Sequence, residues 1–494
     1  MKASYVAAGL GLAYILYAQN VPDFEKRVTE FTLSNGLHFI VAERHDWPVV
    51  SFHTVVKVGS VDDTPGETGL AYLVERVAFK GTETVGTKDW PSEKKALETV
   101  EEAYDRLEAE RNKGPRAEEG RLLMLQMQVK MAIEHAQSTG DPQEYSRILQ
   151  ENGASGLTAA TSADNTDYHY SLPANRVELW FLMESQRLLH PVFRGFYRER
   201  QTVLDEYEVQ PPGNAQRQFL ANFAAAAYAA EPYRNPTVGW PSDVAALRIP
   251  AAKRFFDKYY TPGNMVMAIV GDVQAAEVRR LAERYFGPLP ARPAPPPVHT
   301  VDPPQPGPKS ALVVSKGPGL LAVGFKRPDQ YDRDDIIFDV LQILLANGRS
   351  GLLYKHLVQD RRVAAAAQVV SSFPGGRYPT LFTFLLTPAL GRTADDNERA
   401  LDEVLARLMT QLLAPEELAR AKAQARAGVL RRLADNAELA RILADSYAAY
   451  GDWHKLYGSL NDLNAVTAAD VQRVAVRCFD PKSRTKAVAV REIQ

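Results

Sequence analysis

Glu75 stands between two residues whose spacing suits a metal site and whose chemical types do not. The apolar pattern predicts a helix from about Thr68 to Phe79, so Tyr72 and Arg76, four residues apart, share one helix face. Two imidazoles at this spacing would bind one metal ion together. A phenol, which ionises only near about pH 10, is a poor ligand, and a guanidinium offers no lone pair.

The residues around this motif resemble the signature of a known peptidase family. Gly-Leu-Ala at 69–71 and Ala-Phe-Lys-Gly-Thr at 78–82 flank Tyr-Leu-Val-Glu-Arg. The pitrilysin/insulinase family of zinc peptidases, the inverzincins, has G-L-A-H-x-x-E-H followed by phenylalanine and K-G-T, and H-x-x-E-H is its metal motif. By this resemblance Tyr72 and Arg76 replace the two zinc-binding histidines. Glu75 retains the position of the catalytic general base.

The third ligand position also follows from the resemblance. Residues 199–208, ERQTVLDEYE, are similar to the segment that supplies the third zinc ligand, which places Glu206 there. Catalytic zinc needs three protein ligands and an open position for water. We therefore expect no cofactor in this chain, although active relatives use zinc. We also expect an Arg76–Glu206 ion pair near the Tyr72 hydroxyl, since two unbalanced carboxylates would be costly; the alternative leaves Arg76 pointing to solvent.

Positions that contact substrate in the family have changed as well. The edge strand that binds the substrate backbone carries Asn-Ala in the family and Thr158-Ala159 here. Tyr233 belongs to a stretch that resembles the family's P-Y…G-W-P-S-D segment, and it is the third candidate substrate-binding residue. An arginine and a tyrosine that grip substrate in active members align with Val358 and Ala365. The resemblance thus implies a weakened grip on substrate.

The chain divides at a proline-rich stretch, residues 287–309, which predicts an extended linker. The segments 242–273 and 461–490 share one pattern: an amphipathic helix, a proline turn and an apolar strand. We interpret this as a duplication, with homologous halves at 25–286 and 310–494. Each half is expected to be α+β, a mostly antiparallel sheet covered by helices. Residues 91–151 predict a helical hairpin inserted in the first half and packed on its own domain.

The N-terminus is typical of an export signal, residues 1–18, with cleavage after Ala18. An uncleaved anchor is the alternative. We therefore expect a periplasmic or secreted protein with no membrane contact beyond this segment. A formal net charge of −2 gives no electrostatic case for nucleic acid. The single cysteine, Cys478, excludes an intrachain disulfide and is expected to be a buried apolar residue.

These observations predict a noncatalytic subunit of the peptidase family. It would complete a peptide-binding chamber with an active zinc metallopeptidase partner, as a heterodimer. Two alternatives stay open: an active zinc metalloendopeptidase with non-standard ligands, and a standalone peptide-binding homodimer. None of the nine histidines lies four residues from another, so the spacing does not favour a relocated zinc site.

Overall fold

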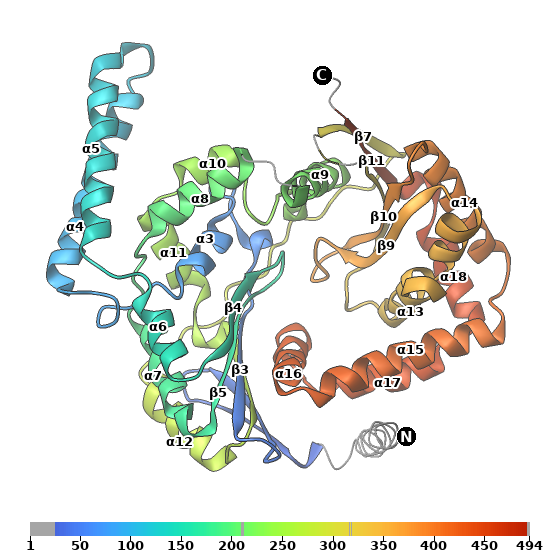
Figure 1. Ribbon diagram of the computed structural model, residues 1–494, viewed down its shortest axis with the longest axis horizontal. Helices are drawn as coiled ribbons and strands as arrows, with labels where there is room; N and C mark the ends of the chain where they lie inside the picture. Colours follow the sequence, from blue (N-terminus) through green and yellow to red (C-terminus); the bar gives the residue numbers. More distant parts are fainter. Residues whose placement is uncertain (1–24, 209–211, 316, 318, 492–494) are drawn as a thin grey trace, which may run out of the picture.

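The computed structural model describes residues 25–208, 212–315, 317 and 319–491, so the predicted signal segment lies outside the described residues. Two sheets dominate the fold (Figure 1). The first consists of β1 Val28–Thr32, β2 His38–Glu43, β3 Val49–Val56, β4 Ser155–Thr161, β5 Thr166–Pro173 and β6 Met265–Gly271. The second consists of β7 Lys309–Ser315, β8 Leu321–Arg327, β9 Ala364–Phe373, β10 Thr380–Pro388 and β11 Arg484–Arg491.

The strand orders of the two sheets repeat each other. The first sheet runs β1-β2-β6-β3-β5-β4 and the second runs β7-β11-β8-β10-β9. Apart from β1, the strands of each half follow the same order, and each sheet has one parallel pair, β2–β6 and β7–β11. All the other pairs are antiparallel. The predicted α+β fold with two homologous halves is confirmed.

Helices cover one face of each sheet and enclose the main cores. The first core is covered by α3 Leu70–Val77, α7 Val177–Leu189, α11 Ile249–Tyr259 and α12 Ala275–Phe286. The second is covered by α13 Asp335–Ala346, α14 Ala394–Thr410 and α18 Ala468–Cys478, where Cys478 is buried. The repeated sequence segments correspond to α11 with β6 and to α18 with β11. Both pairs place an amphipathic helix before an inner strand of the sheet, and this strand is buried throughout in β6 and at alternate residues in β11.

The opposite face of each sheet is covered by a helix from the other half. The helix α16, Asn436–Tyr450, packs on β3 and β6, and its Leu439 and Leu443 belong to one buried cluster with Val55 and Val270. The helix α9, Pro212–Ala227, packs on β7 and β11 of the second sheet. Figure 1 shows both helices in the space between the two sheets. This reciprocal exchange of helices fixes the two halves against each other.

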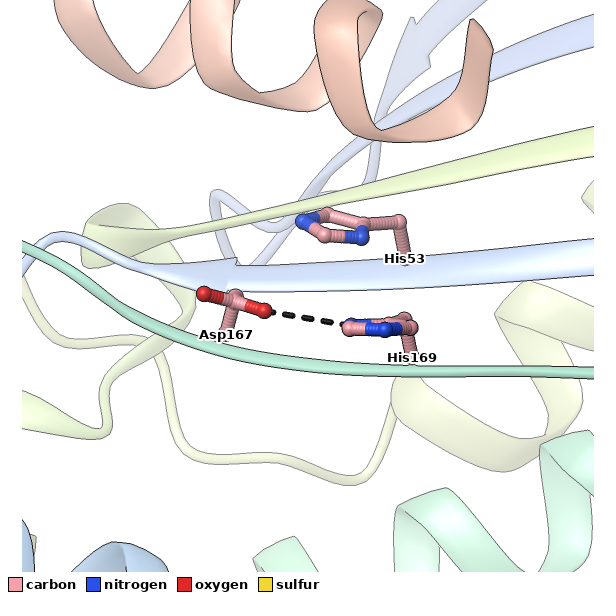
Figure 2. Close-up of side chains that lie close together, drawn as sticks. All are labelled: His53, Asp167 and His169. Carbon is pink, nitrogen blue, oxygen red and sulfur yellow. Dashed lines mark hydrogen bonds and ion pairs between the residues drawn. The ribbon is translucent and has the colours of Figure 1, made fainter. Parts of the chain in front are cut away.

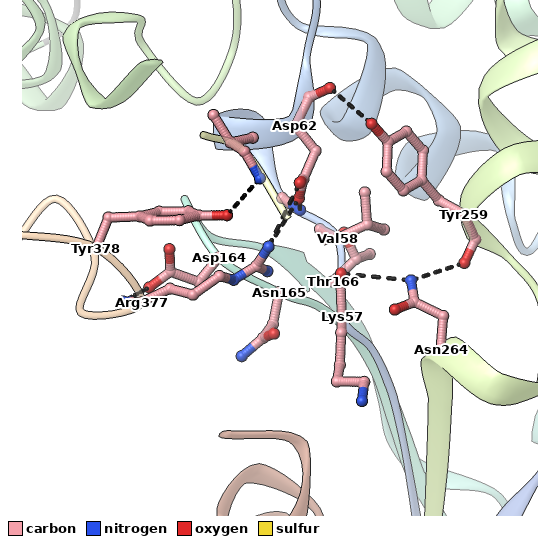
Figure 3. Close-up of polar contacts among 12 residues, drawn as sticks. Lys57, Val58, Asp62, Asp164, Asn165, Thr166, Tyr259, Asn264, Arg377 and Tyr378 are labelled. Carbon is pink, nitrogen blue, oxygen red and sulfur yellow. Dashed lines mark hydrogen bonds and ion pairs between the residues drawn. The ribbon is translucent and has the colours of Figure 1, made fainter. Parts of the chain in front are cut away.

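A polar joint also links the halves (Figure 3). Asp164, at the turn between β4 and β5, accepts hydrogen bonds from the backbone N–H groups of Gly376 and Arg377 at 2.7 and 3.1 Å. The Arg377 guanidinium reaches Asp62 at 3.2 Å. Gly376 and Arg377 belong to the loop between β9 and β10, so this loop of the second half holds the rim of the first sheet. Residues 287–308 contain neither helix nor strand.

The inserted hairpin is formed by α4, Trp90–Arg111, and α5, Glu119–Ser138, which pack on each other. The helix α5 packs on its own domain through Leu125, Val129 and Ala136, which join the first core. Its outer face leaves four apolar side chains at least half exposed: Leu123, Met124, Met127 and Met131. Residues 144–151, which the predicted hairpin included, form a separate helix, α6, whose Tyr145 and Leu149 lie in the first core. No helix among the described residues is both long and apolar enough to cross a membrane.

Candidate functional site: the degenerate metal motif

The helix α3 that carries the motif begins at a tightly fixed position. Gly69, its N-terminal cap residue, has a φ of 89°, and an added Cβ would lie 2.6 Å from the carbonyl oxygen of Val238. Only glycine fits such a left-handed, crowded position without strain. The Asp63 carboxylate accepts hydrogen bonds from the N–H groups of Gly69 and Ala71 at 2.8 and 3.0 Å. These contacts hold the first turn, so the side chains at 72 and 76 have defined directions.

The Arg76 guanidinium binds three groups at once. Its Nη2 and Nε lie 2.8 and 2.9 Å from Oε2 of Glu199. Its Nη1 donates to the Tyr72 hydroxyl at 3.1 Å and lies 3.6 Å from Oε1 of Glu206. The predicted Arg76–Glu206 ion pair with Tyr72 nearby is therefore present. The shorter contacts, however, go to Glu199, which the sequence analysis did not single out.

Both carboxylates come from α8, Phe196–Glu208, where positions seven residues apart lie on one face two turns apart. Lys80 adds a second cation to Glu199 at 2.9 Å, and Arg217 of α9 lies 3.2 Å from Glu206. Burial alone would raise the pKa of Glu199, but Lys80 and Arg76 bring that pKa below its usual range. The sequence could have indicated Glu199 as a member of this site, because Glu199 lies two helical turns before Glu206 within the segment 199–208.

These residues do not fit a catalytic zinc ion. A ligand set needs lone pairs from three side chains, and Arg76 can give none. The Tyr72 oxygen already accepts the Arg76 hydrogen bond, and Glu206 faces two guanidinium groups, those of Arg76 and Arg217. One positive side chain thus lies where the family motif needs an imidazole, and it neutralises the acidic groups around it.

Glu75, which is predicted to retain the general-base position, is 9% exposed. Burial raises its pKa to about 7, against the lowering effect of Arg76. The Thr161 hydroxyl donates a weak hydrogen bond to Glu75 at 3.4 Å. A carboxyl group with this pKa is partly protonated near neutral pH. It could exchange a proton there, but the neighbouring side chains provide no means of activating water.

The predicted substrate-binding residues fall in two different environments. Thr158 and Ala159 lie on β4, the edge strand of the first sheet, with Thr158 exposed. Tyr233 is 1% exposed, and its hydroxyl donates to Asp164 at 2.5 Å. Because this ring is packed between the two halves, it cannot line an open peptide groove in this structure. The substrate-binding expectation for Tyr233 is therefore corrected to a role in the joint between the halves.

The positions aligned with the family's gripping arginine and tyrosine carry only aliphatic side chains. Val358 packs against the second core, and Ala365 is exposed on β9. A cavity of about 350 Å³ nevertheless adjoins the degenerate motif. Tyr72 and Thr161 border it on one side, α9 on another, and Phe373 and Pro374 of the second half close it. Its volume is within the range of pockets that hold small ligands.

Comparison with known proteins places this geometry in a family. The description "Insulinase (Peptidase family M16)" matches residues 39–106, and "Peptidase M16 inactive domain" matches residues 248–425. The chain is 24% identical to the zinc protease PqqE of Helicobacter pylori, over 98% of this chain and 99% of that protein. It is 21% identical to the mitochondrial-processing peptidase subunit alpha of Solanum tuberosum, over 92% of this chain and 81% of that protein.

Solved structures share the fold across almost the whole chain. A protease from Helicobacter pylori superimposes with a TM-score of 0.77 at 21% identity, covering 94% of this chain and 99% of that one. The periplasmic protease PqqL from Escherichia coli gives a TM-score of 0.67 at 17% identity, covering 94% of this chain and 47% of that one. The two matched descriptions follow one another along the chain and together touch both halves, and they show that the chain belongs to the insulinase family of peptidases, M16.

Proposed function

We propose that this chain is a noncatalytic member of its family that completes a peptide-binding chamber with an active zinc metallopeptidase partner. The observation that carries the proposal is the Arg76 guanidinium, held by Glu199, Tyr72 and Glu206. A fixed cation at this position repels a divalent metal ion and occupies the groups that would bind it. Glu75 therefore has no metal-bound water to deprotonate.

Two features of the first half support peptide binding. The free edge of β4 offers backbone N–H and C=O groups to an extended peptide, which would add to the first sheet as a further strand. The cavity beside Tyr72 and Thr161 lies next to this edge and would take a peptide side chain. These features support peptide binding without hydrolysis.

A partner and a location outside the cytoplasm complete the proposal. One relative is by name the alpha subunit of a processing peptidase, which supports a role as one chain of an assembly. The related PqqL is by name periplasmic, and residues 1–18 have the pattern of an export signal. We propose a periplasmic or secreted complex on these grounds.

Restoring the two histidines tests whether the scaffold lacks only its ligands. The double variant Tyr72→His/Arg76→His would place two imidazoles four residues apart beside Glu206, with Glu75 unchanged. We expect it to bind about one more zinc ion per chain than the wild type, measured by mass spectrometry of the metal after gel filtration. The matched control Tyr72→Phe/Arg76→Lys, which provides no imidazole, should bind no additional zinc.

The same preparations decide between a noncatalytic chain and an unorthodox enzyme. The wild-type chain should hydrolyse a mixed peptide library no faster than the buffer does. Chelator-sensitive hydrolysis by the purified wild type that disappears in Glu75→Gln would overturn the proposal, because it would show Glu75 working as a general base.

A further inference from the structure

Three side chains with metal-binding atoms meet on the face of the first sheet that α16 covers (Figure 2). They are His53 on β3 and Asp167 and His169 on β5, and one ligand atom from each lies within 4.8 Å of the others. His53 and His169 are register partners, so their imidazoles lie side by side with ring centroids 5.3 Å apart. Asp167 contacts Nδ1 of His169 at 3.2 Å.

The burial and protonation state of His53 suit a metal ligand. It is 1% exposed, and its Nε2 has no hydrogen-bond partner among the described residues. A buried polar atom without a partner destabilises the folded chain, and a bond to a metal ion would satisfy it. Burial lowers the pKa of His53 to about 4, so the imidazole is neutral at physiological pH and has a free lone pair.

The surroundings carry more negative than positive charge. The helix α16, which covers the three residues, contributes Glu438, Arg441 and Asp445. The Arg441 guanidinium forms ion pairs with Glu438 at 2.8 Å and with Asp445 at 3.1 Å. With Asp167 there are three carboxyl groups, set against the guanidinium groups of Arg441 and of Arg432, whose charge also acts on Glu438. Burial, together with the charge of Asp167, raises the pKa of Asp445 to about 6, against the lowering effect of Arg441. A divalent cation would balance this local excess of negative charge.

We propose that His53, Asp167 and His169 bind one zinc ion between the first sheet and α16, apart from the degenerate motif on α3. Two imidazoles and one carboxylate form a ligand set of known zinc sites, and a fourth position would stay open. Ligand atoms around a tetrahedral zinc ion lie about 3.3 Å apart. Asp167 and His169 already have this spacing, so binding requires mainly that the more widely separated ligand atoms move closer together. The side chains of His169 and Asp167 are 32% and 25% exposed, so a metal ion can reach the site from solvent.

The position of the site suggests its effect. His169 is in register with Thr158 of the edge strand on one side and with His53 on the other. A zinc ion here would stiffen the strands that carry the peptide-binding edge and would lie under a helix of the second half. Binding to the folded chain alone raises its stability with metal concentration. This inference is independent of the proposed noncatalytic function.

The test is a titration of the tag-free full chain, first freed of metal with a chelator, with zinc chloride in a calorimeter. We expect about one equivalent to bind and to raise the midpoint of thermal unfolding. His169→Ala and Asp167→Asn, both at partly exposed positions that tolerate substitution, should each weaken binding at least about tenfold and abolish the thermal shift. Circular dichroism of each variant verifies that it is folded.

Two controls separate this site from other sources of zinc binding. His45→Ala removes an exposed histidine that contacts Asp272 at 2.7 Å, and it should leave the titration unchanged. Glu206→Gln alters the degenerate motif and should also have no effect. The inference is overturned if zinc does not bind, if binding survives both His169→Ala and Asp167→Asn, or if Glu206→Gln abolishes it.

Discussion

The predicted replacement of two histidines by Tyr72 and Arg76 changes the chemistry of the site and leaves its framework in place. The helix start at Gly69, the carboxylates on α8 and the buried Glu75 are all present. Arg76 meets Glu199 and Glu206 with a permanent charge, which satisfies them without a metal ion. An acidic cluster that would be costly alone thus becomes an ion-pair network.

Glu75 should make stability depend on pH. Its folded-state pKa of about 7 is above the ordinary value of 4.5, so the protonated form favours folding, and this contribution is lost progressively as the pH rises from 4.5 to about 7. Glu75→Gln imitates the protonated form at every pH. We expect the variant to match the wild type near pH 4.5 and to exceed its free energy of unfolding by roughly 2–3 kcal/mol at pH 8. Urea unfolding across this pH range measures the difference.

An exposed position provides the control for this experiment. Glu134→Gln on the outer hairpin should leave the free energy of unfolding unchanged relative to the wild type at each pH. If Glu75→Gln and the wild type had the same free energy of unfolding at pH 8, the surroundings of Glu75 would not destabilise its ionised form, which would contradict the prediction.

The residues of the motif could be predicted from sequence, and their neighbours only in part. Tyr72, Arg76 and Glu206 lie in segments with recognisable flanks, so their positions followed from local patterns. Glu199 was missed because its partnership with Arg76 depends on how closely α8 approaches α3. The meeting of His53 with His169 depends on strand register, which no spacing between histidines along the chain reveals.

At the scale of elements, α16 links the halves through apolar side chains. Leu443 is fully buried against the first sheet, although it belongs to the second half. Leu443→Ala should lower the free energy of unfolding by about 2–5 kcal/mol, because it leaves a cavity between the halves. Leu412→Ala, at a side chain that is 62% exposed, should change it by less than about 0.5 kcal/mol. Chemical unfolding followed by tryptophan fluorescence measures both.

The sequence predicted which elements exist better than where they pack. The helix that carries Glu75, the repeated helix–strand units and the two helices of the insertion were all visible as local patterns. An amphipathic helix shows that it has an apolar face but not which sheet that face will meet. The exchange of α9 and α16, and the exposed methionines of α5, are therefore outcomes of tertiary packing.

At the scale of the whole molecule, the proposed function predicts a change on mixing. Adding this chain to a relative from the same organism that carries an intact H-x-x-E-H should produce a species with the summed mass in light scattering. The peptidase rate of the mixture should exceed that of the relative alone. Replacing the glutamate of the partner's motif by glutamine should abolish hydrolysis, whereas Glu75→Gln in this chain should not. A stable self-dimer that ignores the relative would favour the homodimer alternative.

The crossing of α9 and α16 between the halves limits how such a chain can change over evolutionary time. Deleting either half would strip a covering helix from the sheet that remains and expose an apolar surface to water. Selection for solubility therefore keeps both halves, whatever happens at residues 72 and 76. A protein built in this way is free to exchange the side chains of its reactive centre, but it cannot be shortened to one half.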